Sequence, residues 1–172
     1  MTQQEIESAL QNLDRRVKAI EEQLGLSPPI PGKPLQGVDV YRGQGDIDWD
    51  QVARAGFHFA IVKATEGVNF IDKKLTRNAK GASRAGLKIG YYHFGRPDTG
   101  SDHQSDARAE AADFLEAIAP LPDPDVLRFE SGGSAAVWLD LEKAVDNLDE
   151  KEGLAWIVEW LRVVEKQWPV GL

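Results

Sequence analysis

The chain has 172 residues, of which 42% are hydrophobic, and a formal net charge of −8 at pH 7. A chain of this length can bury one good core, and it contains no apolar run long enough for a membrane-spanning helix. The absence of cysteine excludes disulfides, a thiol nucleophile and cysteine-ligated metals. Because basic runs are also lacking, the acidic balance argues against nucleic acid as a partner.

Residues 2–25 are predicted to form a separate coiled-coil helix. The apolar residues alternate in spacings of four and three, as in a heptad seam, and they are Ile6, Leu10, Leu13, Val17, Ile20 and Leu24. We expect this seam to join copies of the chain into a homo-oligomer; packing of the helix on its own domain is the alternative. Residues 26–35 contain four prolines and are predicted to form a semi-rigid linker. The polar, acidic N-terminus argues against a secretory signal peptide.

Residues 36–172 are predicted to form one α/β domain in which strands and helices alternate. The strands read as near-continuous apolar runs and are expected at residues 37–41, 57–64, 87–94 and 136–142. Helices capped by Asp48 and Asp72 are expected to end near residues 55 and 85, and two more are expected over 105–118 and 149–167. Right-handed connections between such parallel strands give either a barrel or a doubly wound sheet.

Polar side chains lie at or near the carboxyl ends of all the predicted strands, and in both architectures the chemistry occurs at the carboxyl ends of parallel strands. They are Asp39, Lys63, Glu66, Tyr92, His93, Asp140 and Glu142. In an extended strand Asp140 and Glu142 point the same way, about 7 Å apart at their Cα atoms. Such a pair pushes one carboxyl pKa up, which suits acid-assisted cleavage of a glycosidic bond; two solvated acids at a strand end are the plainer alternative.

Two of these residues have structural alternatives, and the predicted edge does not suggest a nucleotide or metal site. His93 suits substrate binding and a hydrogen-bonded structural role equally well, and Lys63 could form a salt bridge with Glu66 or Asp39. The segment 43–45 lacks the third glycine and the lysine of a phosphate loop. The histidines lack metal-ligand spacing.

Five segments in order and spacing resemble glycoside hydrolase family 25, the lysozymes that cut the glycan of bacterial peptidoglycan. The matching residues are 37–40 (GVDV), 44–49 (QGDIDW), 63–67 (KATEG), 85–94 (AGLKIGYYHF) and 139–142 (LDLE). The resemblance implies a TIM-like barrel of five βα units finished by three antiparallel strands. Because residues 169–172 read as the start of strand five, we expect a barrel truncated after about four and a half strands. A second chain, or another copy, would then complete it.

The resemblance also implies an activity and roles for the residues at the predicted edge. The substrate would be the β-1,4 bond between N-acetylmuramic acid and N-acetylglucosamine. Glu142 would be the general acid, Asp140 would stabilise charge or orient the substrate, and Asp39 would lie opposite. The residues expected to bind the glycan are Tyr92, His93, Glu66, Lys63 and Tyr41. No metal or other cofactor is implied, because proton transfer and charge stabilisation suffice.

The sequence departs from the family at Tyr41, where the family has serine, so a bulky ring is expected near the glycan. A non-catalytic structural or glycan-binding phage component on the same scaffold is the alternative function. A family 18 chitinase would need an acid at Trp138. We expect no signal peptide, although the implied substrate lies outside the cytoplasm. This combination suggests a phage enzyme that is carried in the virion or released to the cell wall.

Overall fold

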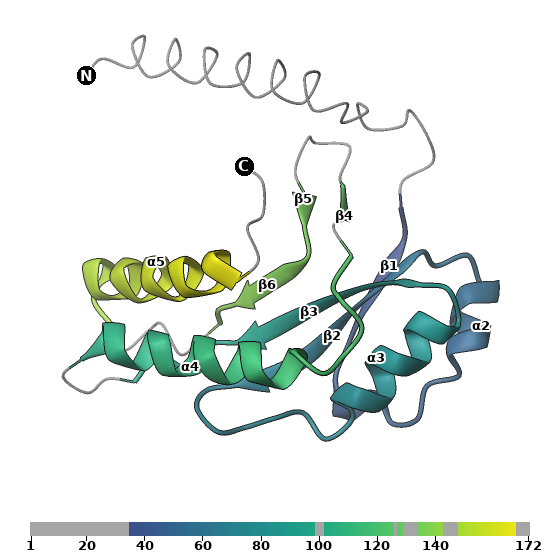
Figure 1. Ribbon diagram of the computed structural model, residues 1–172, viewed down its shortest axis with the longest axis horizontal. Helices are drawn as coiled ribbons and strands as arrows, with labels where there is room; N and C mark the ends of the chain where they lie inside the picture. The colour runs from purple at the N-terminus through teal and green to yellow at the C-terminus, as the bar shows by residue number, and fades with distance from the viewer. Residues whose placement is uncertain (1–34, 99–101, 126, 129–133, 143–147, 168–172) are drawn as a thin grey trace, which may run out of the picture. The chain divides into compact units, whose positions relative to one another are not determined.

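The computed structural model describes residues 35–98, 102–125, 127–128, 134–142 and 148–167 (Figure 1). The predicted coiled-coil helix, residues 2–25, and all of the predicted linker except Leu35 lie outside the described residues. None of the helices in the described ranges is both long and apolar enough to cross a membrane.

The centre of the fold is a parallel sheet in the order β1-β2-β3-β6. Its strands are β1 (Gly37–Val40), β2 (Phe59–Glu66), β3 (Lys88–Phe94) and β6 (Val137–Asp140). Short strands β4 (Leu127–Arg128) and β5 (Ser134–Ala135) pair in a separate two-stranded sheet, which the sequence did not predict. The predicted parallel sheet is therefore confirmed, with small changes in the boundaries of its strands. Strand β2 runs on to Glu66, and β6 ends at Asp140, so Glu142 lies beyond the strand.

Helices lie between the strands in the predicted order. They are α2 (Trp49–Arg54), α3 (Leu75–Arg84), α4 (His103–Ile118) and α5 (Glu150–Gln167), with a short 3-10 helix η1 (Arg42–Gln44) after β1. The predicted cap of α2 is confirmed, because the Asp48 carboxylate accepts a hydrogen bond from the Gln51 N–H at 3.0 Å.

The prediction that Asp72 caps α3 is wrong. The helix begins at Leu75, with Lys74 in the N-cap position. The buried Asp72 carboxylate instead accepts hydrogen bonds from the backbone N–H groups of Lys74, at 2.9 Å, and Arg42, at 3.0 Å. The N–H of Arg42 comes from a distant part of the chain, so local spacing could not reveal this use of the carboxylate. The contact ties the loop after β1 to the turn before α3.

One face of the sheet packs against helices and forms the core. Alternate strand residues point to this face, among them Val40, Ala60, Val62, Ile89 and Tyr91. Helices α4 and α5 lie side by side (Figure 1). The predicted packing of Trp156 and Trp160 is confirmed, since both are buried; Trp160 stacks on the His93 ring of β3, with 5.5 Å between centroids.

The opposite face of the sheet carries the polar residues. The register sets Asp39 beside Ile61, Tyr92 between Lys63 and Trp138, and Phe94 between Glu66 and Asp140. Gly90 leaves room for the indole on this face, because a Cβ there would lie 2.3 Å from Cζ3 of Trp138.

Candidate active site

An irregularity in β2 brings Lys63 and Glu66 to the same face. Residues three apart in a regular strand point to opposite faces. Here Lys63 pairs with Tyr92 but Thr65 pairs with His93, so Ala64 is an extra residue in the ladder. The bulge restores Glu66 to the side of Lys63, and the Lys63 Nζ lies 2.6 Å from the Glu66 Oε2. The sequence pattern of β2 gave no sign of this change in register.

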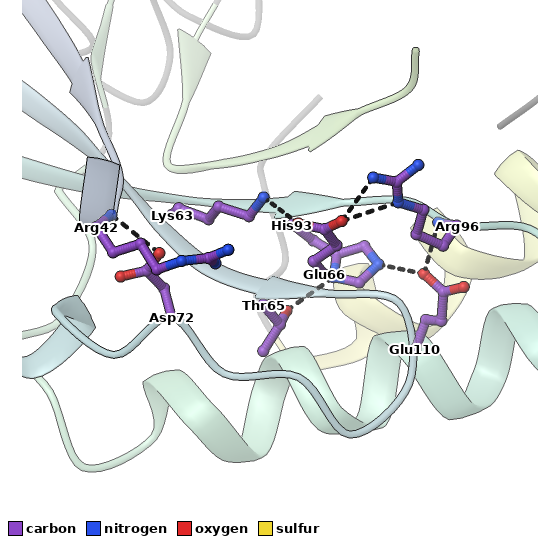
Figure 2. A network of polar contacts seen from close by, with 8 residues as sticks. All are labelled: Arg42, Lys63, Thr65, Glu66, Asp72, His93, Arg96 and Glu110. Carbon is purple, nitrogen blue, oxygen red and sulfur yellow. Dashed lines mark hydrogen bonds and ion pairs between the residues drawn. The ribbon is translucent and has the colours of Figure 1, made fainter. Parts of the chain in front are cut away.

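Glu66 is held between two cations (Figure 2). Its Oε1 accepts hydrogen bonds from Arg96, at 2.9 Å from Nε and 2.6 Å from Nη2, while its Oε2 accepts from Lys63. Burial opposes ionisation of Glu66, but the hydrogen bonds from Lys63 and Arg96 outweigh it and lower the pKa of this carboxyl. The predicted alternative of a Lys63–Glu66 salt bridge is therefore present in the structure.

Aromatic rings surround the Lys63 ammonium. Its Nζ lies 4.4 Å from the ring centroid of Phe94 and 6.0 Å from those of Tyr41 and Tyr92. Lys63 is buried, whereas the Tyr41 ring is 40% exposed. The rings and Glu66 together hold the cation in place, so Lys63 acts on its surroundings as a fixed positive charge.

The predicted carboxylates gather at this end of the sheet. Burial, followed by the nearby charges of Glu142 and Asp39, raises the pKa of Asp140, and the Lys63 ammonium partly opposes that rise. Asp39 and Glu142 are exposed, while Asp140 is half-buried. Burial and then the carboxylates of Asp39 and Asp140 raise the pKa of the Tyr92 phenol, which keeps it a hydrogen-bond donor. Although Glu142 follows the strand end rather than lying within it, its charge still acts on Asp140.

His93 does not join the other predicted site residues. Its side chain has no exposed surface and points to the helix-packed face, between Thr65 and Glu110. The structure therefore supports the structural alternative for His93, while Asp39, Tyr41, Lys63, Glu66, Tyr92, Asp140 and Glu142 share one end of the sheet.

Sequence reasoning missed Arg96, Phe94 and Glu110. Arg96 stands two residues after β3, next to the predicted polar residues at the end of that strand, and lies over the Phe94 ring at 4.6 Å. Glu110 interrupts an otherwise apolar stripe of α4, made by Ala107, Ala111, Phe114 and Ile118. A lone acid on a buried helix face was the available signal for Glu110.

This arrangement has the parts that glycosidic bond cleavage requires. Exposed and half-buried carboxyl groups lie together, and burial with the neighbouring charges raises the pKa of Asp140. A fixed cation and a phenol that remains a donor stand beside them. Carboxyl groups in unlike environments can serve as proton donor and as stabiliser of positive charge on the sugar.

Comparison with known proteins agrees with this chemistry. Residues 38–170 match the family model described as glycosyl hydrolases family 25. The chain is 42% identical over 88 residues to lysozyme M1 of Streptomyces globisporus, across 48% of this chain and 30% of that protein. The chain belongs to glycosyl hydrolase family 25, the family of lysozymes to which its sequence motifs pointed.

Solved structures show the same fold. A muramidase from Trichobolus zukalii superposes with a TM-score of 0.61 at 25% identity, over 77% of this chain and 60% of that one. The CTP1L endolysin superposes with a TM-score of 0.56 at 26% identity, over 79% of this chain and 42% of that one. The chain thus spans less than two thirds of the length of each of these relatives.

Proposed function

We propose that this protein is an N-acetylmuramidase that cleaves the β-1,4 bond between N-acetylmuramic acid and N-acetylglucosamine in peptidoglycan. The observation that carries the proposal is the convergence of Asp39, Asp140 and Glu142 at the end of the sheet where Lys63 and Tyr92 lie. Membership of family 25 supports the glycan as substrate.

In this mechanism Glu142 is the general acid. Its carboxyl group gives a proton to the glycosidic oxygen as the bond from that oxygen to the anomeric carbon breaks. The exposure of Glu142 leaves it open to a glycan chain. After the leaving group departs, the same carboxylate accepts a proton from the attacking water, which restores the acid.

Asp140 stabilises the positive charge that develops on the sugar. Either it orients the substrate's own 2-acetamido oxygen for attack on the anomeric carbon, or it acts on that carbon directly. Burial and neighbouring carboxylates raise the pKa of Asp140, and the Lys63 ammonium partly offsets that rise and so supports the ionised form. Asp39, on the opposite edge strand of the described sheet, positions the sugar or a water, and Tyr41 and Tyr92 contact the glycan.

Matched variants of the two acids test these roles. Glu142→Gln keeps the shape of the side chain but removes its proton, so hydrolysis of purified cell walls should fall by about 10²–10⁴-fold. On a synthetic aryl glycoside, whose leaving group departs without protonation, Glu142→Gln should keep much of the bond-cleavage step, and its remaining defect should lie in the attack of water. Asp140→Asn should be impaired on both substrates. Wild-type rates in Glu142→Gln on cell walls would remove Glu142 from the mechanism.

The same assay separates hydrolysis from the alternative function. A non-catalytic glycan-binding component would sediment with cell walls without releasing reducing ends, and Glu142→Gln would leave its behaviour unchanged. As for localisation, we propose a phage enzyme that is either carried in the virion or released to the bacterial cell wall. An oligomer formed by residues 2–25 would anchor several such domains together.

A further inference from the structure

Behind the candidate site, buried polar side chains link α4 to β2 and β3 (Figure 2). Thr65 Oγ1 lies 2.7 Å from His93 Nδ1, and His93 Nε2 lies 2.6 Å from Glu110 Oε2. The same Glu110 oxygen accepts the backbone N–H of Arg96 at 3.1 Å. Thr65, His93 and Glu110 are fully buried. We call these three residues the Thr65–His93–Glu110 chain.

Packing alone gives no reason for a carboxylate at position 110. Its neighbours on the buried stripe of α4 are Ala107, Ala111 and Phe114. A buried carboxylate is costly unless its oxygens are satisfied, and an apolar residue at such a position is often as stable or more stable. Among the described residues, the second oxygen of Glu110, Oε1, has no hydrogen-bond partner. Because burying the Glu110 carboxylate costs folding free energy, its presence here points to a role other than stability.

The two ends of the Thr65–His93–Glu110 chain contact the backbone segments that position Glu66 between Lys63 and Arg96. We call Lys63, Glu66 and Arg96 the Glu66 network. Thr65 stands between the bulge at Ala64 and Glu66, so its bond to His93 fixes the register that brings Glu66 beside Lys63. At the other end, Glu110 holds the backbone of Arg96, whose side chain binds the other oxygen of Glu66. One buried carboxylate therefore supports both sides of the Glu66 network.

We propose that Glu110 is a positioning residue of the active site, acting through His93 and Thr65 on the bulge and through the Arg96 N–H on Arg96. It thereby holds Glu66 between its two cations and keeps the Lys63 ammonium beside Asp140. This inference rests on the proposed muramidase activity only for its kinetic test.

Two matched pairs test the proposal in the purified protein, with a polypeptide that extends the sheet added to every variant if the wild-type chain alone is inactive. Thr65→Val removes the hydroxyl at constant shape, whereas Thr65→Ser keeps it. Glu110→Leu removes the acceptor, whereas Glu110→Gln keeps an oxygen for the His93 and Arg96 N–H groups. We expect kcat to fall about 10–100-fold in Thr65→Val and Glu110→Leu, with KM changed less, because small displacements of catalytic groups are costly. The serine and glutamine variants should recover most of kcat.

The pH profile and a core variant separate positioning from stability. The charged or titratable groups that act on Asp140 are Glu142, Lys63 and Asp39. If Thr65→Val lets the Lys63 ammonium move away from Asp140, the pKa of Asp140 rises further. The acidic limb of the kcat profile should then shift to higher pH in this variant. Ile118→Ala, which shortens a buried side chain elsewhere on α4, should lower the melting temperature without either kinetic change. Kinetics of Thr65→Val and Glu110→Leu that match Ile118→Ala would overturn the proposal.

Hydrogen exchange tests the same linkage without activity. Glu110→Leu should speed amide exchange both around residues 63–66 and at Arg96, and Ile118→Ala should not. Unchanged exchange in both segments would refute the proposal even in an active enzyme. A wild-type chain that stays inactive even together with a polypeptide that extends the sheet, but whose exchange responds as expected, would instead count against the muramidase function alone.

Discussion

Asp140 and Glu66 lie in one cluster, yet their ionisation has opposite effects on the folded state. The Asp140 carboxyl is half-buried and lies near the carboxylates of Glu142 and Asp39, with the Lys63 ammonium as one opposing charge. Ionisation of Asp140 therefore destabilises the fold. Glu66 receives hydrogen bonds from two cations, which make its negative charge favourable. The cluster therefore places a stabilising carboxylate beside a destabilising one, as expected where chemistry rather than stability sets the charge pattern.

This difference predicts opposite pH dependences of stability. The folded-state pKa of Asp140 is raised above its ordinary 3.8, so its favourable contribution is present below 3.8 and is lost as pH rises through the folded value. Asp140→Asn should therefore be more stable than wild type at pH 7 and equal to it in strong acid. The folded pKa of Glu66 lies below 4.5, so its contribution is present above 4.5 and is lost as pH falls through the folded value. Glu66→Gln should then be less stable than wild type at pH 7.

Urea unfolding of both variants and wild type between pH 3 and pH 8 checks the signs. The stability difference for each variant should shrink toward acid pH. A stability of Asp140→Asn at pH 7 below that of wild type would contradict the assigned cause, and so would a Glu66→Gln penalty that persists in strong acid.

Among the elements, the polar face of the sheet depends on a glycine. Gly90 lies on β3, and a Cβ there would lie 2.3 Å from the Trp138 ring and 2.9 Å from the Ile61 Cδ1. The Trp138 indole thus crosses over β3 from β6, within the row that also carries Tyr92. The close approach fixes how these strands present their polar side chains.

Gly90→Ala should overpack this face and cost about 1–3 kcal/mol of unfolding free energy. Replacing the indole with a smaller ring in Trp138→Phe should relieve the contact. The double variant should therefore be less destabilised than the sum of the two single variants, as measured in a double-mutant cycle by urea unfolding. Additive losses would mean that the strain arises elsewhere than at Trp138.

The elements were more predictable from the sequence than the contacts between them. Strand and helix periods are local properties, and every long element within the described residues was predicted to within a few residues. The bulge at Ala64 was not, because an apolar run such as residues 59–64 has the same composition with or without an extra residue in the ladder. Seven of the predicted site residues share one end of the sheet because parallel topology alone gathers strand ends. His93 faces the core because its partner Glu110 comes from a helix, a tertiary contact that spacing does not encode.

At the scale of the whole molecule, the described parallel sheet has two edges. Strand β1 pairs with β2 alone and β6 pairs with β3 alone within the described residues, so backbone groups of both strands remain open to further pairing. The carboxylates lie on these edge strands, since Asp39 belongs to β1 and Asp140 to β6. We therefore expect association at the edges to affect the site directly.

The predicted seam of residues 2–25 gives a second route to association, and the two routes separate in one experiment. We expect residues 1–172, purified alone, to be multimeric by light scattering. We also expect them to hydrolyse cell walls only when further strands, from another polypeptide, extend the sheet. Val17→Asp places a charge in the seam and should lower the mass while the circular dichroism of the folded domain is kept, because an unpaired charge opposes apolar burial. If the mass stays high, the sheet edges rather than the seam hold the copies together. A monomeric wild-type chain that clears cell walls unaided would show that the edges need no partner and that this end of the sheet is competent as it stands.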